Sequence, residues 1–347
     1  MTEAVAQHPW RMPHEATPHE RTWMAFPTQG YALGSSDAEA EEARATWAAV
    51  ANAIIDFEPV TMVVNPGDEK LARRVLSGQV DIVSAPLNDA WMRDMGPTFV
   101  VDDTGRLGAV CWTFNGWGAQ SWARWDKDSK VNRFVAELAG AVPVVSPLVN
   151  EGGGIHVDGR GTVLVTETVQ LDPGRNPGMS RAEVEAELAR TIGAQQAIWL
   201  PRGLWRDAQR FGTRGHVDIV ATFTESGRVL YHDQTNPDHP DHEISATIRR
   251  TLEACLDEFG PVRELVPVPA PRTLTDAEGP VDYSYINHLL VNGGVVACSF
   301  HDARDEAAAE ILADSFPGRE VVSVDARPLF ARGGGIHCIT QHQPKAV

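Results

Sequence analysis

A cysteine close to the C-terminal end of the chain follows a run of three glycines. The run occupies residues 333–335, and Cys338 comes shortly after it. Consecutive glycines carry no side chains, so a ligand or another strand can approach this backbone closely. The alternation of residues after the glycines predicts the start of a strand, from which Cys338 would point into the space that they leave open. A lone cysteine is nevertheless more often a buried structural residue than a nucleophile.

An earlier segment of the chain repeats this one. Residues 152–156 and residues 333–337 both read Gly-Gly-Gly-Ile-His, but Val157 stands in the first copy where the second has Cys338. Glu151 directly precedes the first copy. The repetition favours a functional interpretation of Cys338, and it predicts two repeats of one fold that meet at a shared site.

Two more clusters of polar residues could contribute to the same chemistry. The first lies in residues 88–97 and contains Trp91, Arg93 and Asp94; taken alone, its charged residues fit a surface ion pair as well as a site. In the second, His216 and Asp218 are two positions apart, which places them on one face of a predicted strand.

These residue types together suit nucleophilic attack on a carbon that carries positive charge. A guanidinium carbon is a poor electrophile because its charge is delocalised, so carboxylates must hold and polarise its NH₂ groups. Asp94 and Asp218 suit that role. A thiolate is a strong nucleophile and is stabilised beside a bound cation and a protonated imidazole, which are the roles we expect for Cys338 and His216.

Two other classes of function stay open at this point. His156 and Asp158 have the same spacing as His216 and Asp218, so a metal-dependent hydrolase that uses the two His-x-Asp pairs is one alternative. The other is a protein that binds guanidines or polyamines without catalysis.

Alternating strand and helix patterns predict an α/β fold. A hairpin of residues 218–223 and 229–231, followed by a helix, indicates repeated antiparallel ββα units, and no linker divides the chain, so we expect one domain over residues 1–347. The helix after Ser180 has capping-box spacing. The expected strands are 60–64, 80–83, 98–101, 108–114, 142–145, 162–166, 197–200, 218–223, 229–231, 263–268, 289–291, 295–299 and 320–324, and the expected helices are 36–57, 66–76, 130–139, 180–191, 242–259 and 302–316.

Composition narrows the class of protein. The 347 residues are 43% hydrophobic, and 47 Asp and Glu against 30 Lys and Arg give a formal charge of -17, which argues against nucleic acid as a partner. The four cysteines form no Cys-x-x-Cys pair, no signal-peptide pattern is present, and no apolar run is long enough to span a bilayer. We therefore expect a cytoplasmic protein without membrane partners, and a homo-oligomer stays open.

Five blocks of sequence carry a resemblance to a known family. They are residues 18–27, 91–97, 151–159, 215–218 and 333–341. With these blocks the chain resembles the agmatine deiminase family, which is related to bacterial peptidylarginine deiminases and belongs to the guanidine-modifying enzymes. The resemblance implies the pentein fold, a five-bladed α/β-propeller of ββαβ repeats around a central active site, with no metal and no organic cofactor.

The resemblance also implies a role for each matching residue. Cys338 would be the nucleophile and His216 the general acid and base. Asp94 and Asp218 would hold the guanidinium of a small cationic substrate, and Glu151 would support both the guanidinium and the histidine. Trp91, Arg93 and Gly335 would complete the binding site. Agmatine would yield N-carbamoylputrescine and ammonia through a covalent S-alkylthiouronium intermediate.

The chain departs from the family pattern near the predicted substrate tail. Arg214, Ile219 and Ile336 stand where the family usually has other residues. An arginine at the mouth of the site would repel an ammonium tail by about 1 to 4 kcal/mol at ~4 Å, which would favour a guanidine that carries a carboxylate, such as an arginine-like compound or a C-terminal peptidyl-arginine. If Arg214 instead points to solvent or pairs with an acid such as Asp207, agmatine stays the expected substrate. Residues 112–125, which include Trp117 and Trp122, are a candidate lid, although these tryptophans fit ordinary packing anchors equally well.

Overall fold

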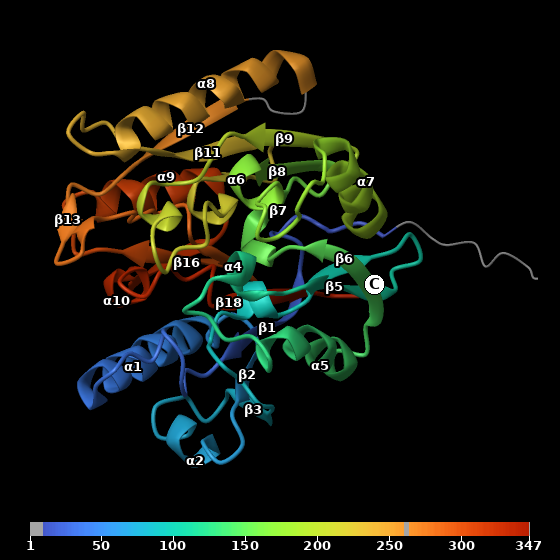
Figure 1. The fold of residues 1–347 in the computed structure, drawn as a ribbon. Coiled ribbons are helices and arrows are strands. Elements are labelled where there is room, and N and C mark those ends of the chain that lie inside the picture. Colours follow the sequence, from blue (N-terminus) through green and yellow to red (C-terminus); the bar gives the residue numbers. More distant parts are fainter. Residues whose placement is uncertain (1–9, 260–263, 347) are drawn as a thin grey trace, which may run out of the picture.

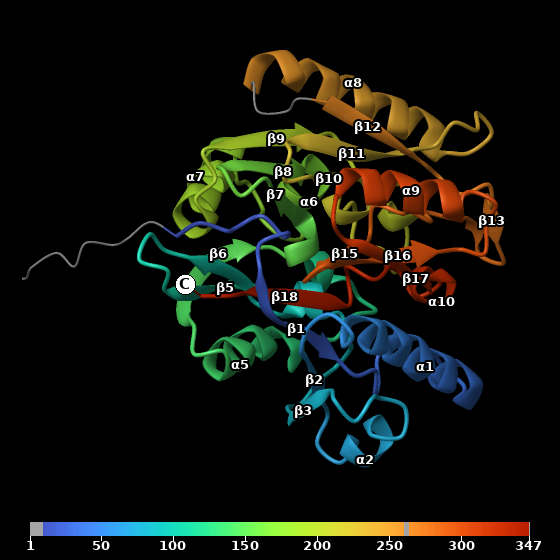
Figure 2. The ribbon, with the colours of Figure 1, turned by 180° about the vertical axis from the view of Figure 1, so that it is seen from behind.

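The computed structural model describes residues 10–259 and 264–346, which form an α/β fold. Within these residues the strands make five sheets of three or four strands, and β13 (Thr275–Asp276) and β14 (Gly279–Pro280) form a separate two-stranded pair. Figures 1 and 2 show α1, α5, α7 and α8 on the outside of the molecule and the strands further in. No helix in the described part of the chain combines the length and the apolar character needed to cross a membrane.

Four of the five sheets share one construction. Their first two strands are antiparallel neighbours, and the third runs parallel to the second after a longer connection that contains a helix. A parallel pair requires such a crossover, whereas an antiparallel pair needs only a short turn. The four sets are β4 (Thr98–Val101), β5 (Leu107–Thr113), α5 (Val131–Leu138) and β6 (Val142–Val149); β7 (Ile155–Val157), β8 (Thr162–Thr166), α7 (Arg181–Ile192) and β9 (Gln196–Leu200); β10 (Ala221–Phe223), β11 (Arg228–Asp233), α8 (Asp241–Phe259) and β12 (Glu264–Pro269); and β15 (Leu289–Val291), β16 (Gly294–Ser299), α9 (Asp305–Ser315) and β17 (Glu320–Asp325).

The fifth sheet joins the two ends of the chain. β18 (Thr340–Pro344) is antiparallel to β1 (His19–Ala25), and β2 (Val60–Val64) is parallel to β1 after α1 (Asp37–Ile54). β3 (Asp81–Ser84) then adds to β2 after α2 (Glu69–Ala72). The last strand therefore completes a sheet that the first strand begins, and Cys338 lies directly before it.

Local sequence signals explain where the helices begin. Ser36 caps α1 and Ser180 caps α7, and in both cases a glutamate three residues later returns a hydrogen bond to the cap backbone. α7 ends at Gly193, whose φ of 71° is the left-handed conformation that glycine adopts without strain. The capping box predicted at Ser180 is thus confirmed.

Three predicted elements are wrong, and two of them carry candidate site residues. The segment around Cys338 is a turn, closed by a hydrogen bond from Thr340 N to His337 O, and the strand begins only at Thr340. Val217–Ile219 form a 3₁₀ turn, not the first part of a strand, because the amide of His216 bonds to the side chains of Thr213 and Asp207 in place of a neighbouring strand.

The third wrong element is the helix expected over 66–76. It is reduced to the single turn of α2, where Asp68 makes no capping hydrogen bond through its side chain. The cluster around Asp94, expected as the approach to a strand, forms the short helix α3 (Met92–Met95). The beginning of the strand expected over 263–268 falls at Arg263, which lies outside the described residues.

Candidate active site

Cys338 lies at the bottom of a buried cavity. The residue is 4% exposed, and its Sγ lies 3.4 Å from Asp218 Oδ2 and 3.3 Å from Asn287 Nδ2. A Cβ added at Gly334 would come within 3.1 Å of this sulfur, so glycine is needed there for the thiol to fit. Burial, followed by the charges of Asp218 and Asp94, raises the pKa of the Cys338 thiol well above its usual value. The thiol is therefore neutral until a cation enters.

His216 is held as an imidazolium beside Asp94, which lines the cavity. Its Nε2 lies 3.2 Å from Glu151 Oε2, and its Nδ1 lies 3.7 Å from Asp94 Oδ1. Burial lowers the pKa of His216, but Asp94 and Glu151 outweigh that effect and raise it to about 9. Nδ1 has no hydrogen-bond partner among the described residues. A protonated ring with one free N–H facing the site is suited to donate a proton to a leaving group.

Asp94 and Asp218 are the two carboxylates nearest to the thiol. Asp94 accepts hydrogen bonds from Trp117 Nε1 (2.9 Å) and Gly153 N (3.4 Å), and burial raises its pKa to about 6 in spite of His216. Although burial acts in the other direction, His337 lowers the pKa of Asp218. Asp218 Oδ1 has no partner within the described residues. This unpaired acceptor fits an N–H group of a bound cation.

The first triple glycine packs against these groups. A Cβ at Gly153 would lie 2.5 Å from His216 Nδ1 and 3.1 Å from Asp94 Oδ1. The absence of a side chain thus lets the imidazole and the carboxylate approach the backbone of this loop. The two glycine runs therefore serve one site, as their repetition predicts: one accommodates His216 and Asp94, the other accommodates Cys338.

Glu151 is balanced by a cation that no sequence pattern indicates. Arg175 Nε lies 3.0 Å from Glu151 Oε2, and both side chains are fully buried. Arg175 also donates to Asp172 (2.9 Å) and to Thr213 O (2.7 Å). Burial raises the pKa of Glu151, but Arg175 and His216 together lower it below the usual value. Arg175 stands in a loop whose composition is typical of a surface connection, so no sequence signal pointed to it.

A second missed group supports Cys338 and Asp218 from behind. His337 Nδ1 lies 2.8 Å from Asp218 Oδ2, and its Nε2 lies 3.1 Å from Glu15 Oε1. Asn287 donates to the sulfur of Cys338 and accepts from the amide of His337 through Oδ1 (3.0 Å). His337 directly precedes Cys338 in the repeated segment, which was the available signal, whereas nothing in the sequence linked Glu15 or Asn287 to it.

Aromatic side chains close the cavity on the outer side. Trp117 and Trp122 stack with ring centroids 5.3 Å apart, and Phe211 lies 5.3 Å from Trp122. Trp117 (φ 57°) and Phe211 (φ 73°) adopt the left-handed conformation, which is strained for bulky residues and concentrates at functional sites. The free volume in the cavity is about 10 Å³, close to the room that one water molecule needs. A larger ligand requires this cover to move, and residues 112–125 supply part of it.

The remaining predicted residues fall into two groups. Trp91 lines the cavity with Cys338, and a Cβ at Gly335 would lie 2.4 Å from Asn287 Oδ1. Arg93 does not line the cavity: its guanidinium donates to His337 O (3.2 Å) and lies 3.4 Å from Glu15. Its contacts support a positioning role behind the site and not contact with a ligand.

Arg214 also lies away from the cavity. Its Nη1 donates to both carboxylate oxygens of Asp172, at 2.8 and 2.6 Å. Pairing with an acid was one of the placements left open for Arg214, with Asp207 as the example. The carboxylate of Asp207 instead accepts from Thr213 and from the amide of His216. Asp172 therefore compensates the charge that would have repelled a cationic tail.

The two His-x-Asp pairs do not form a common cluster. His156 Nε2 lies 2.7 Å from Thr222 Oγ1, and His156 Nδ1 accepts from Phe223 N (3.3 Å). Residues 10–259 and 264–346 include no group of three or more His, Cys, Asp or Glu side chains arranged to hold a metal ion. His216, in contrast, lies next to Glu151 and Asp94.

A buried thiol, an imidazolium and paired carboxylates on an α/β fold define a guanidine-modifying hydrolase, and comparison identifies the family. The chain belongs to the Porphyromonas-type peptidyl-arginine deiminase family, whose profile matches residues 11–344. Among curated proteins it is 57% identical over 97% of its length to 99% of a Streptomyces coelicolor protein named "Putative agmatine deiminase". It is also 39% identical over 96% of its length to 95% of the agmatine deiminase of Pseudomonas aeruginosa.

Solved structures give the same result. The agmatine deiminase of Enterococcus faecalis superposes with a TM-score of 0.90 at 32% identity, covering 98% of this chain and 97% of that one. The Porphyromonas gingivalis protein described as "Putative Arginine Deiminase" superposes with a TM-score of 0.86 at 26% identity, covering 97% of this chain and 99% of that one. The expected family and the expected class of enzyme, a hydrolase of C–N bonds in amidines, are confirmed.

Proposed function

We propose that this protein hydrolyses agmatine to N-carbamoylputrescine and ammonia, with Cys338 as the nucleophile. The agmatine deiminases of Pseudomonas aeruginosa and Enterococcus faecalis and the Streptomyces coelicolor protein named "Putative agmatine deiminase" match it over nearly their full length. The observation that carries the residue assignment is the arrangement around the thiol: Cys338 Sγ lies 3.4 Å from Asp218, while Asp94 shares the same cavity and lies 3.7 Å from His216.

The first half of the reaction follows from these charges. The guanidinium binds between Asp94 and Asp218, and its positive charge offsets the carboxylates that hold the pKa of the thiol high. Cys338 therefore gives its proton to a water molecule, which carries it to the solvent, where the released ammonia takes it up. The thiolate forms a C–S bond to the guanidinium carbon. His216 then gives its proton to one NH₂ group, the C–N bond breaks, and ammonia leaves an S-alkylthiouronium cation on Cys338.

The second half restores the enzyme. His216, now neutral, takes a proton from a water molecule as the water oxygen bonds to the same carbon. The C–S bond breaks, the proton of the new hydroxyl passes to sulfur, and the ureido product leaves. His216 is protonated again, and Glu151 holds it in place at 3.2 Å through both halves.

The substrate follows from the charges around the site. A guanidine with a carboxylate tail was the alternative because of Arg214, but this residue is paired with Asp172. Because Asp172 compensates the charge of Arg214, this charge no longer favours a substrate with a carboxylate tail. Agmatine, which the named relatives act on, is the substrate that we propose.

Three features of the whole chain belong to the same proposal. The five sheets form the blades of a pentein propeller around one axis, which is supported by their shared construction and by the completion of the first sheet by β18. Residues 1–347 make a single catalytic domain, because strands from both ends of the chain pair with each other. We place the enzyme in the cytoplasm. Limited proteolysis tests the single domain: we expect no stable fragment that lacks either end.

The chemistry is tested with three proteins: the parent, Cys338→Ala, and Cys111→Ala as a control that removes another buried thiol from β5. Ammonia release is measured with agmatine, arginine and a peptide that ends in arginine. We expect turnover of agmatine by the parent and by Cys111→Ala and none by Cys338→Ala. Acid quenching of the parent during turnover should leave the mass of the substrate minus ammonia on the peptide that contains Cys338. Turnover by Cys338→Ala would overturn the mechanism, and a higher kcat/KM for arginine would overturn the substrate.

A further inference from the structure

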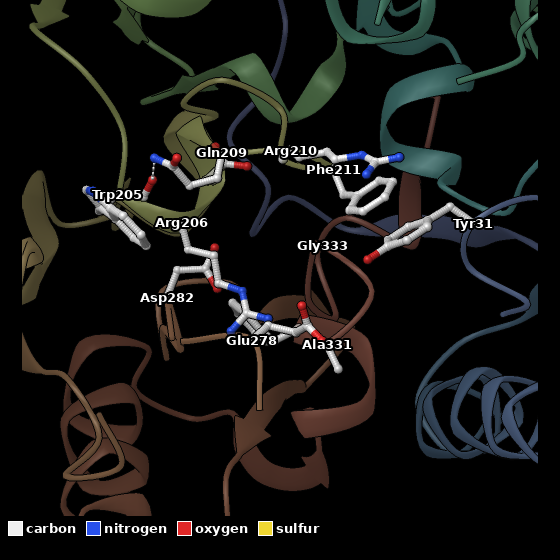
Figure 3. Close-up of a pocket in the computed structure, with 13 residues that line it drawn as sticks. Tyr31, Trp205, Arg206, Gln209, Arg210, Phe211, Glu278, Asp282, Ala331 and Gly333 are labelled. Carbon is white, nitrogen blue, oxygen red and sulfur yellow. Dashed lines mark hydrogen bonds between the residues drawn. The ribbon is translucent and has the colours of Figure 1, made fainter. Parts of the chain in front are cut away.

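A larger pocket adjoins the cavity at Cys338. It has a free volume of about 300 Å³, and Phe211 and Gly333 line both spaces, so these two residues form the wall between them. Figure 3 shows Arg206 and Asp282 on one side of the pocket and Phe211 with Tyr31 on the other. An aliphatic chain that starts at Cys338 and passes between Phe211 and Gly333 would end in this pocket.

Asp282 is the buried acid of this pocket whose carboxylate accepts no hydrogen bond from another of the described residues. It is 6% exposed, and within the described residues the only hydrogen bond to its carboxylate comes from its own backbone. Arg206, the nearest cation, donates to Asp276 at 2.7 Å. Asp207 in the same wall is different, because it accepts three hydrogen bonds from Thr213 and His216. A buried carboxylate without donors is costly unless a cation joins it.

The protonation state of Asp282 also depends on whether the pocket is filled. Burial, followed by the charges of Asp207 and Asp241, raises the pKa of Asp282 to about 8, although Arg206 acts in the opposite direction. The side chain is therefore mostly protonated at neutral pH while the pocket is empty. A bound ammonium would favour its ionised form and would form an ion pair with it out of bulk water.

A second pocket on the other side of the aromatic cover is the rival. It has a free volume of about 340 Å³, and the buried Asp89 lines it together with Arg124. The carboxylate of Asp89 already accepts hydrogen bonds from the amides of Tyr31, Ala32 and Ala90. Burial still raises the pKa of Asp89 to about 7 in spite of these hydrogen bonds. Because its oxygens already have donors in the loop, Asp89 leaves less room for an ammonium than Asp282 does.

We propose that Asp282 binds the primary ammonium at the far end of the substrate and thereby determines specificity for a cationic tail. This inference rests on the proposed function, since it assigns the second end of the same substrate. The guanidinium lies between Asp94 and Asp218, the methylene chain crosses the wall at Phe211 and Gly333, and the ammonium faces Asp282. A carboxylate in that position would meet a like charge.

The test compares two substrates that differ only in the ammonium. Agmatine carries it, and butylguanidine has a methyl group in its place. Asp282→Asn removes the buried charge, and Glu278→Gln is the matched control because it removes an exposed charge from the same pocket. For Asp282→Asn we expect kcat/KM for agmatine to fall roughly 10- to 100-fold, the usual loss for a hydrogen bond to a charged group. For butylguanidine we expect no change, and for Glu278→Gln changes of less than about 3-fold on both substrates.

The outcomes separate the inference from the proposed function. Unchanged kcat/KM for agmatine in Asp282→Asn would overturn the role of Asp282 and direct the tail to the pocket beside Asp89. An equal loss on both substrates would also overturn it, since a general structural defect would then explain the effect. We expect the Tm of Asp282→Asn to equal or exceed that of the parent, because Asp282 must take up a proton when the chain folds at neutral pH and Asn does not. If the parent releases ammonia from neither guanidine, the proposed function fails, and the inference fails with it.

Discussion

The hydrogen bond from Trp117 to Asp94 offers a direct measurement of how the site holds a guanidinium. Trp117 Nε1 donates to Asp94 Oδ2 at 2.9 Å, and the pKa of Asp94 is about 6 with this bond in place. Trp117→Phe keeps the aromatic ring and removes the donor. A hydrogen bond to a charged group contributes about 1.5–3 kcal/mol, which corresponds to roughly 1 to 2 pKa units. We therefore expect the pKa of Asp94 to rise to between about 7 and 8 in the variant.

The sign of the pH dependence follows from which form binds the ligand. The ionised form of Asp94 binds the guanidinium, so affinity is full above the pKa and falls about tenfold per unit as the pH drops below it. His216, with a pKa of about 9, is still protonated between pH 5 and 8. Glu151 and Asp218, whose pKa values are lowered, are ionised there. Of these four groups around the cavity, only Asp94 titrates in the window.

The assay uses Cys338→Ala as the parent, so that no reaction and no thiol ionisation interferes, and butylguanidine as the ligand, so that the tail pocket does not contribute. Calorimetry from pH 5 to 8 should show that the affinity of this parent for butylguanidine falls as the pH drops below about 6. With Trp117→Phe added, the same loss should occur about 1 to 2 units higher, giving at pH 6 a Kd weaker by roughly 5- to 50-fold.

Trp122→Phe is the matched control for this experiment. Trp122 stacks on Trp117, but its N–H donates to Gln120 and not to Asp94. We expect its midpoint to equal that of the parent. An unshifted midpoint for Trp117→Phe would refute the role of the hydrogen bond, and equal shifts for both variants would attribute the effect to loosening of the cover.

Two further predictions concern groups that support the site. Arg175→Met leaves the carboxylate of Glu151 buried without its cation, so we expect a loss of about 3–5 kcal/mol in the free energy of unfolding, measured in urea. Arg190→Met, which breaks an exposed ion pair with Glu187, should lower the free energy of unfolding by less than about 1 kcal/mol. Equal losses in the two variants would refute the view that burial makes the loss of Arg175 costly. Gly334→Ala places a methyl group 3.1 Å from Cys338 Sγ and 2.7 Å from Trp91, so ammonia release should fall at least about tenfold while the Tm changes little. Gly318→Ala, at a turn of φ 83° with open space around the added carbon, is its control, and equal activity of the two variants would show that the thiol tolerates the methyl group.

The amino-acid sequence by itself determined the kinds of residue in the site and the order of most elements. Strands and helices with strong periodicity or caps, such as β2, β8 and α7, lie where local pattern predicts them, because that pattern depends on neighbouring residues alone. The repeated Gly-Gly-Gly-Ile-His segments pointed to Cys338 and Glu151, and the charges required by a guanidinium pointed to Asp94, His216 and Asp218.

Only the tertiary structure decided which partners these residues have. Arg175 approaches Glu151 from a loop that reads as an ordinary surface connection, and Glu15 reaches His337 from the opposite end of the chain. Arg214 turned to Asp172 and not to Asp207, and Cys338 and His216 stand on turns where alternation predicted strands. The physical reason is that a buried charge takes whichever partner the packed chain brings near. The spacing of residues along the sequence carries no record of that proximity.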